Sequence, residues 1–265
     1  MKIAIAGAAG RMGQMLIQRI ANTDGCSLAG AIEAAGSNAL GRDAGEVAGV
    51  GAKGVKIVSD SAAAIAAAQV VIDFTVPAAT VAHAKIAADK GVAMVIGTTG
   101  LSPEQSALIH KAAKKVPIMW AANMALGVNI LMALVEKTAA MLDPSYDIEI
   151  LEMHHRHKID APSGTALALG HSAAAGRKVE LEKVWRRSRD GHTGARPTGE
   201  IGFATLRGGE EVGVHTVMFA SAGERLELTH RSFSREGYAM GAVMAAKWLE
   251  GRKPGLYGMK DVLGL

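Results

Sequence analysis

The glycine-rich segment near the start of the chain constrains the fold more than any other feature. Gly7-Ala8-Ala9-Gly10-Arg11-Met12-Gly13 follows an apolar run and leads into a helical pattern. Glycines at this spacing allow a tight turn, a close backbone approach to a phosphate group, and close packing of a helix on a strand. The N-terminus of the helix offers unpaired N–H groups and a partial positive charge to anions. The segment therefore predicts a strand–turn–helix unit that binds the pyrophosphate of a dinucleotide.

The order of expected elements places this turn in an α/β domain. Apolar runs alternate with helical patterns through the first half of the chain, which is typical of parallel βαβ units. We expect strands at Lys2–Ala6, Ser27–Glu33, Val55–Val58, Val70–Phe74, Val92–Ile96 and Ile118–Ala121, and helices at Arg11–Ala21, Ala78–Lys90 and from Ser102 onward. The uncharged stretch Val116–Val135 is long enough to span a bilayer, but its Pro, Asn and Gly residues favour a strand, a loop and a buried helix.

The pattern changes after Asn123. An apolar-striped helix is expected first, and the strand-like runs that follow are not separated by long helical patterns, which favours a mixed or antiparallel sheet. These elements are the helix Val128–Leu142, the strands Asp147–Glu152, Gly202–Arg207, Gly213–Phe219 and Arg225–His230, and a last helix, Tyr238–Leu249, that is expected to pack back on the first domain. We therefore predict a Rossmann-like parallel-sheet domain over residues 1–125, completed by 235–265, and a second α+β domain over 126–234.

An acidic residue follows the glycine turn at the distance that dinucleotide binding requires. Glu33 lies twenty residues after Gly13, at the end of the second expected strand, where an acid can hydrogen-bond the adenine ribose hydroxyls. The next residues, Ala34 and Ala35, offer no basic group to a 2′-phosphate, and Glu33 would repel one. We therefore expect NADH to be used at least as well as NADPH, although Arg11 can still reach a phosphate.

Two loops are expected to flank the nicotinamide ring. Phe74-Thr75-Val76-Pro77 ends the fourth expected strand and Gly97-Thr98-Thr99-Gly100 ends the fifth. Ligands of open α/β sheets bind at the carboxyl ends of strands, so both loops are well placed. Their small residues let a flat ring approach, although the same residues are also ordinary turn formers.

Composition and charge narrow the class of protein. The chain has 265 residues and a formal net charge of +4, which suits an anionic ligand without requiring a nucleic acid. Cys26 is the only cysteine, so no intrachain disulfide can form and a reducing compartment is favoured. Met1–Gly7 carries no signal-peptide pattern, and we expect a cytoplasmic protein that uses no membrane.

The densest cluster of functional side chains lies between Glu152 and Ala166. Its sequence is Glu152-Met153-His154-His155-Arg156-His157-Lys158-Ile159-Asp160-Ala161-Pro162-Ser163-Gly164-Thr165-Ala166. Three histidines, an arginine and a lysine fall within five residues, and their mutual repulsion is unfavourable unless an anion offsets it. Ser163-Gly164-Thr165 then begins an expected helix, whose N-terminus is a second anion site. The segment is therefore typical of a site that binds carboxylates.

Several kinds of site remain open for this basic segment. A solvated loop and a nucleic-acid patch are alternatives, but the segment has no aromatic residues for single-strand stacking. A metal site is another, but no cysteine or well-spaced acid completes a tetrahedral set, so we expect no metal. The fourth is a reductase site, where one cation supplies a proton and the others bind substrate carboxylates.

The whole segment closely resembles the signature of bacterial dihydrodipicolinate reductases. The resemblance extends over the chain and includes the glycine turn, Phe74–Pro77, Gly97–Gly100, Ala121-Ala122-Asn123-Met124 and Gly223–Arg231. It implies an NAD(P)H-dependent oxidoreductase that converts 4-hydroxy-tetrahydrodipicolinate, the product of dihydrodipicolinate synthase, into tetrahydrodipicolinate with loss of water. It also implies a role in diaminopimelate and lysine biosynthesis, a cytoplasmic location and a homotetramer.

The resemblance also assigns roles by position. It implies that His154 is the general acid and Lys158 its catalytic partner, and that His155, Gly164 and Thr165 bind carboxylate, with Ser163 beside them. The matching cofactor positions are Gly7–Met12, Glu33, Gly97, Thr98, Thr99, Ala121, Ala122, Asn123 and Met124. Hydride addition to an unsaturated C–N system leaves negative charge, which a protonated His or Lys within hydrogen-bond reach neutralises.

The chain departs from the family pattern at two positions. Many relatives have a basic residue in place of Ala34, and some have one in place of Val76, so a strong NADPH preference is not expected. Two rival functions remain: a dehydrogenase acting on another amino dicarboxylate, and a non-catalytic NAD-sensing regulator that would not need the segment His154–Thr165.

Overall fold

The computed structural model describes residues 1–265, which divide into two compact units. The first unit comprises Met1–Leu126 and Glu236–Leu265, and the second comprises Gly127–Arg235. None of the helices combines the length and the apolar character needed to cross a lipid bilayer. The uncharged stretch Val116–Val135 forms a strand, a loop and the start of a helix, as its sequence predicted.

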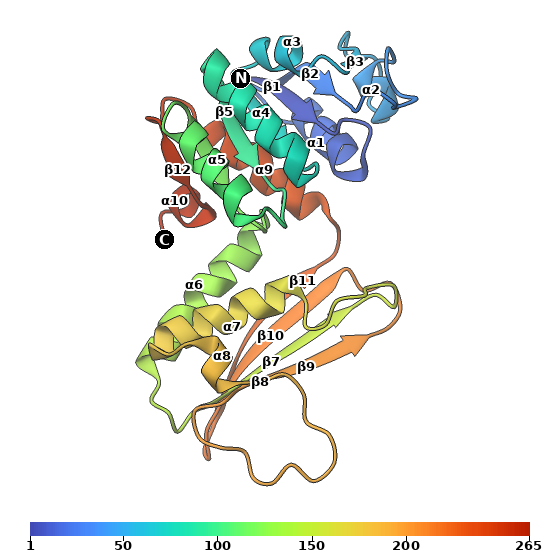
Figure 1. The fold of residues 1–265 in the computed structure, drawn as a ribbon. Helices are drawn as coiled ribbons and strands as arrows, with labels where there is room; N and C mark the ends of the chain where they lie inside the picture. Colours follow the sequence, from blue (N-terminus) through green and yellow to red (C-terminus); the bar gives the residue numbers. More distant parts are fainter. The chain divides into compact units, whose positions relative to one another are not determined.

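A seven-stranded sheet forms the centre of the first unit (Figure 1). Its strands are β1 (Lys2–Ala6), β2 (Ser27–Ile32), β3 (Ile57–Val58), β4 (Val70–Asp73), β5 (Ala93–Ile96), β6 (Pro117–Trp120) and β12 (Gly255–Tyr257). All neighbouring strands are parallel, in the order β12-β6-β5-β4-β1-β2-β3. The chain adds β2 and β3 on one side of β1 and β4 to β6 on the other, so the order reverses at β1, where open α/β sheets bind ligands.

Helices cover both faces of this sheet. On one face lie α1 (Arg11–Ala21), α9 (Glu236–Trp248) and α10 (Met259–Leu263), and on the other α3 (Ser61–Ala66), α4 (Pro77–Lys90) and α5 (Pro103–Ala113). Successive strand residues point to opposite faces, so Ile3 and Ile5 join the first core while Ala4 and Ala6 join the second. The last long helix, α9, packs on α1, so the end of the chain belongs to the first compact unit. The short helix α2 is Ala44–Val47.

The second unit is built on a five-stranded mixed sheet (Figure 1). Its strands are β7 (Asp147–His154), β8 (Trp185–Arg186), β9 (Ile201–Arg207), β10 (Gly213–Ala220) and β11 (Arg225–Ser232), in the order β11-β10-β7-β9-β8. β10 is antiparallel to β7 and β11, whereas β9 is parallel to β7 and β8. The helices α6 (Leu126–Met141) and α7 (Gly164–Arg177) share one apolar core with the sheet, and α8 is Leu181–Val184. The predicted fold class, a Rossmann-like domain plus a mixed-sheet α+β domain, is confirmed.

Several elements differ from the sequence prediction. The strand expected to end at Glu152 continues to His154, and the strand expected over Val55–Val58 is only Ile57–Val58. The sequence did not predict β8 or β12, because strands of two or three residues carry too few positions for a periodic pattern. β12 nevertheless extends the parallel sheet by pairing with β6.

Packing at the glycine turn can be tested at Gly13. A Cβ at this position would lie 2.0 Å from the carbonyl oxygen of Gly7, so the helix and the turn would have to separate. We expect Gly13→Ala to lower the free energy of unfolding in urea by about 1–3 kcal/mol, the usual cost of overpacking. Gly36→Ala is the matched control, because a Cβ there meets no atom within 4 Å. Equal losses in the two variants would contradict this packing argument.

Candidate active site

The glycine turn between β1 and α1 has the geometry of a phosphate site. Gly7 adopts the left-handed region, with φ of 72°, and the N–H groups of Gly7 and Ala8 donate to the carbonyl oxygen of Ile32 at 2.9 and 3.0 Å. The amides of residues 11–13, in the first turn of α1, donate to no protein acceptor. These amides are the donors that a helix N-terminus offers to an anion. The turn therefore fits the pyrophosphate of a pyridine nucleotide.

Glu33 follows β2 directly and lies beside this turn. One carboxylate oxygen accepts the N–H of Ala9 at 2.9 Å, and the other accepts the N–H of Ala34 at 3.2 Å. The side chain is half-buried, whereas Ala34 and Ala35 are exposed. The structure thus brings the predicted ribose-binding acid and the predicted phosphate turn together at the carboxyl ends of β1 and β2.

A buried network supports the two loops after β4 and β5. Asp73 is fully buried, and its carboxylate accepts hydrogen bonds from the ring of His83 at 2.7 Å and from the backbone and hydroxyl of Thr75 at 2.9 and 2.6 Å. The Thr80 hydroxyl bridges Asp73 and Thr98, because it lies 3.2 Å from the Asp73 carboxylate and 2.7 Å from the Thr98 hydroxyl. Burial raises the pKa of Asp73, but the hydrogen bonds from His83 and Thr75 outweigh it and leave the pKa below its ordinary value. The Thr98 hydroxyl is therefore held inside this network.

The predicted loops after β5 and β6 also lie together. The amide of Ala121 donates to the carbonyl oxygen of Ile96 at 3.1 Å, and the indole of Trp120 donates to the carbonyl oxygen of Thr98 at 3.3 Å. The Asn123 side chain accepts the N–H of Ala125 at 2.9 Å. Of the remaining predicted positions here, Thr99 and Ala122 are exposed and Met124 is buried. In the first unit, the predicted cofactor residues therefore gather at the carboxyl ends of the strands.

In the second unit, His154 ends β7 with its ring bound to a buried acid. Its Nδ1 lies 2.6 Å from Oε2 of Glu152, and the two residues are only 9% and 1% exposed. Arg207, at the end of β9, donates to both oxygens of Glu152 at 2.8 and 2.9 Å. Burial raises the pKa of Glu152, but the hydrogen bonds from Arg207, His154 and the Ser163 amide outweigh it and hold the pKa below its ordinary value. Burial lowers the pKa of His154, and Glu152 offsets only part of this shift.

The N-terminus of α7 begins at Ser163, as the sequence predicted. The Ser163 hydroxyl accepts the N–H of Ala166 at 3.1 Å, and its amide donates to Glu152 at 3.0 Å. A Cβ at Gly164 would meet no atom within 4 Å, so the start of the helix is open to an approaching group. The same hydroxyl lies 3.0 Å from Nε2 of His215, a buried residue of β10. The helix start, which is the predicted carboxylate site, is thus joined to the His154 pair through Glu152.

The remaining residues of the basic segment differ in their contacts. Nζ of Lys158 lies 2.8 Å from Oδ1 of Asp160, and this ion pair lowers the pKa of Asp160. The amide of His155 donates to Glu211 at 2.7 Å, while its buried Nδ1 has no protein partner. His157 is exposed and lies 4.0 Å from the exposed Glu210. Lys158 and His155 are therefore held close to His154 along the chain, whereas His157 faces solvent.

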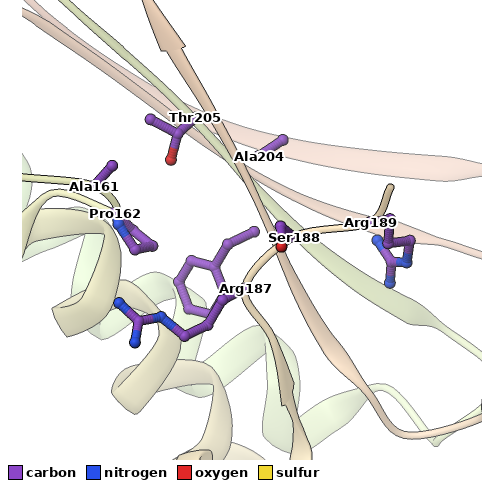
Figure 2. A pocket seen from close by; sticks show the side chains of 8 residues that line it. Ala161, Pro162, Arg187, Ser188, Arg189, Ala204 and Thr205 are labelled. Carbon is purple, nitrogen blue, oxygen red and sulfur yellow. The ribbon is translucent and has the colours of Figure 1, made fainter. Parts of the chain in front are cut away.

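A cavity of about 560 Å³ borders the Ala161–Pro162 segment (Figure 2). It is lined by Ala161, Pro162, Arg187, Ser188, Arg189, Phe203, Ala204 and Thr205. None of the predicted site residues lines it. The candidate site is therefore the surface formed by the end of β7 and the start of α7, and this cavity is a neighbour of it.

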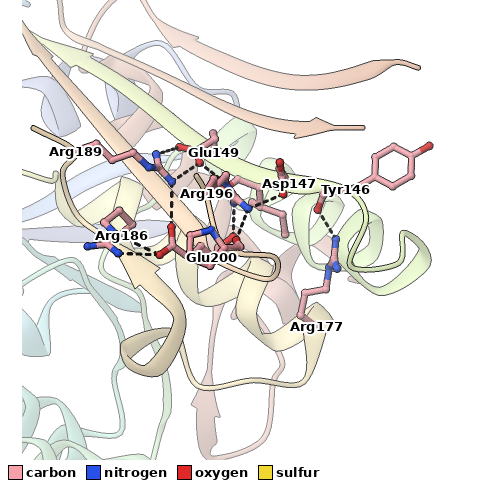
Figure 3. A network of polar contacts seen from close by, with 10 residues as sticks. Tyr146, Asp147, Glu149, Arg177, Arg186, Arg189, Arg196 and Glu200 are labelled. Atoms are coloured by element: carbon pink, nitrogen blue, oxygen red, sulfur yellow. Dashed lines mark hydrogen bonds and ion pairs between the residues drawn. The ribbon is translucent and has the colours of Figure 1, made fainter. Parts of the chain in front are cut away.

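The segment after β8 forms one border of this cavity and carries an ion-pair network (Figure 3). Arg189 donates to both oxygens of Glu149 at 3.0 and 2.9 Å, and Arg196 donates to Glu149 and Asp147 at 2.9 and 2.6 Å. Glu149 and Asp147 lie on the opposite face of β7 from His154, because strand residues alternate. These hydrogen bonds tie the arginines of the segment to β7 of the sheet.

Three residues of the second-unit site were not predicted as functional: Glu152, Arg207 and His215. The signal for Glu152 was present, because strand alternation places it on the same buried face as Ile148 and Ile150, where an acid is costly without partners. Arg207 and His215 lie 55 and 52 residues from their partners Glu152 and Ser163, so nothing local identifies those contacts. In the first unit, the buried Asp73–His83 pair was also not predicted, although its two residues lie only ten positions apart.

Comparisons with known proteins match the same reductase family over nearly the whole chain. The family models described as dihydrodipicolinate reductase, N-terminus and C-terminus match residues 1–124 and 127–263. Relatives named 4-hydroxy-tetrahydrodipicolinate reductase from Methylocella silvestris and Brucella abortus are 57% and 54% identical. Each match covers 100% of this chain, and it covers 97% and 99% of the respective relatives.

Solved structures show the same fold. A dipicolinate-bound dihydrodipicolinate reductase from Paenisporosarcina sp. TG-14 has a TM-score of 0.78 at 25% identity, covering 98% of both chains. An amine dehydrogenase from Mycobacterium smegmatis has a TM-score of 0.61 at 16% identity, covering 96% of this chain and 94% of that one. The second likeness concerns the fold alone.

The buried His215 predicts a pH dependence of stability. Burial, with a smaller effect from His154, lowers its pKa from 6.5 to about 4. The unfolded chain therefore binds a proton between these pH values that the folded chain does not, so stability is full above pH 6.5 and falls as the pH drops toward 4. The loss from this group is on the order of 3 kcal/mol, since each pKa unit corresponds to about 1.4 kcal/mol.

Urea denaturation across this pH range measures the effect. His215→Gln removes the titrating ring and keeps an oxygen that can accept the hydrogen bond from Ser163. We expect the variant to lose less stability than the wild type as the pH falls. Parallel curves for the two proteins would show that His215 is not the group responsible.

Proposed function

The chain belongs to the dihydrodipicolinate reductase family, and we propose that its site reduces 4-hydroxy-tetrahydrodipicolinate to tetrahydrodipicolinate with loss of water. The observation that supports the proposal is that Glu152 contacts both His154 and the N-terminus of α7, while Lys158 lies near enough to lower the pKa of His154. Relatives that share more than half of the sequence carry this reductase name. They favour neither rival, the dehydrogenase of another amino dicarboxylate or the NAD-sensing regulator.

The first unit holds the pyridine nucleotide in this proposal. The amides at residues 11–13 would bind the pyrophosphate, Glu33 the adenine ribose, and the loops after β4, β5 and β6 the nicotinamide end. When bound in its reduced form, the nucleotide supplies the hydride. The Asp73 network would keep the loops after β4 and β5 in place, because a buried and fully hydrogen-bonded acid fixes the groups around it.

The second unit binds and protonates the substrate. A substrate carboxylate would lie at the start of α7, near Ser163, Gly164 and Thr165, with His155 beside it. A dianion at this surface favours the protonated forms of nearby bases, so its binding raises the pKa of His154 and prepares the ring to give up a proton. Lys158 would add a second positive charge where negative charge develops on the substrate.

Each unit takes its domain role from the ligand that it binds in this proposal. We propose that residues 1–125 with 235–265 are the dinucleotide-binding domain and residues 126–234 the substrate-binding and oligomerisation domain. Hydride transfer requires the two ligands to meet during turnover. We also propose a metal-independent, cytoplasmic homotetramer acting in diaminopimelate and lysine biosynthesis, which rests on the family resemblance.

Substitutions in the basic segment test the proposed chemistry. We expect His154→Ala and Lys158→Ala each to lower turnover of the synthase product by roughly 10²–10⁴-fold, the range that general acid–base catalysis contributes. Thr165→Val should mainly raise KM, because it weakens carboxylate binding. His157→Ala is the matched control from the same segment, because its ring is exposed, and it should retain activity. Wild-type turnover in both His154→Ala and Lys158→Ala would reject the assigned roles.

Cofactor choice is tested separately. We expect NADH to support turnover at least as well as NADPH, because Glu33 repels a 2′-phosphate and the exposed Ala34 and Ala35 offer it no cation. Parallel assays with the two cofactors, followed at the nicotinamide absorbance, measure the ratio. A strong preference for NADPH would show that another cation, such as Arg11, determines the selectivity.

A further inference from the structure

Glu152 receives hydrogen bonds from four donors, although it is only 1% exposed. Arg207 contributes two at 2.8 and 2.9 Å, the amide of Ser163 one at 3.0 Å, and Nδ1 of His154 one at 2.6 Å. An ionised carboxylate has no proton to give, so each of these partners must donate. His154 must therefore carry its proton on Nδ1.

The three other donors hold Glu152 in one orientation. The guanidinium of Arg207 is a planar fork, and one of its nitrogens also donates to the carbonyl oxygen of Asp160 at 2.6 Å. Ser163 belongs to the start of α7 and cannot move without the helix. The position of Oε2 beside His154 is thus determined by groups on β9 and α7 as well as by β7.

We propose that Glu152 is a positioning residue, which holds His154 in the Nδ1–H tautomer and thereby presents Nε2 to the substrate. The inference rests on the proposed function and names a residue through which that site is organised. Nε2 lies beside Gly213, where even a Cβ would come within 3.1 Å, so the residue on β10 must be small at this point.

The charged and titratable groups around His154 are consistent with this role. Burial lowers the pKa of His154, Glu152 raises it in part, and Lys158 and Arg207 lower it, so that the net shift is downward. The ring of His215 lies 5.0 Å away at an angle of 72°. Because the pKa lies below its ordinary value, the ring of the free protein is neutral near pH 7 and Nε2 is a proton acceptor. The ring then takes a proton at Nε2 when a dianion binds and can return it to the reduced substrate.

Glu152→Gln is the informative substitution, because it keeps the shape and adds an N–H donor. Every neighbour of the carboxylate is itself a donor, and only the His154 ring can change from donor to acceptor. The amide nitrogen should therefore face His154 and drive its ring into the Nε2–H tautomer, which leaves no lone pair for the substrate. We expect turnover to fall by roughly 10²–10⁴-fold, the contribution of general acid–base catalysis.

Nitrogen-15 NMR of the histidine rings shows which ring nitrogen carries the proton, and this measurement does not depend on enzyme activity. The His154 signals are identified by their loss in His154→Ala. We expect the wild type to carry the proton on Nδ1 and Glu152→Gln to carry it on Nε2. Glu149→Gln is the matched control, because it removes a carboxylate from the opposite face of the same strand, and it should change neither the tautomer nor the turnover.

The possible results distinguish a failure of the Glu152 proposal from a failure of the proposed function. An Nε2–H tautomer in the wild type overturns the proposal, and so does wild-type turnover in Glu152→Gln. If Glu152→Gln does not fold, as judged by circular dichroism, the wild-type tautomer alone decides. A wild type that does not turn over the synthase product contradicts the proposed function, whereas the tautomer measurement still reports on Glu152.

Discussion

The arrangement of the candidate site in the second unit depends on the hydrogen bonds that a single buried carboxylate, that of Glu152, must receive. An unpaired ionised acid in a protein interior is costly by several kcal/mol, so the chain must supply donors wherever it places one. For Glu152 these donors come from the end of β7, the end of β9 and the start of α7. The hydrogen bonds that the Glu152 charge requires therefore bring His154 and the N-terminus of α7 together. This contact determines the geometry of the site.

The first unit also contains a buried acid with several hydrogen-bond donors, and this acid supports the loops predicted to bind the cofactor. Asp73 ends β4 and accepts hydrogen bonds from α4 through His83 and Thr80 and from its own loop through Thr75. The loop after β5 is joined to this network through Thr98. In both units a buried acid near the carboxyl end of a central strand joins the segments around it by hydrogen bonds.

The parts of the structure that the sequence predicted are those with local signals. The glycine turn, Glu33 after β2 and the capped start of α7 each depend on residues close together in the chain, and all three lie where they were expected. The alternation of apolar runs and helices predicted the parallel sheet, because every βαβ unit repeats the same pattern.

The contacts that complete the site could not be predicted in this way. Arg207 reaches Glu152 only because β9 pairs with β7 in one register, which places Arg207 opposite His154. His215 meets Ser163 through the pairing of β10 with β7. Such register depends on the whole sheet, and a shift of one residue would turn each side chain to the other face. An acid on the core face of β7 was the one local sign that partners had to exist.

The most direct test of the account is a crystal structure of the complete chain with a reduced pyridine nucleotide and pyridine-2,6-dicarboxylate. The account predicts one carboxylate at the amides of Gly164 and Thr165, near His155, with Nε2 of His154 facing the ring. A dicarboxylate bound away from these groups, for example in the cavity lined by Arg187 and Phe203, would contradict it.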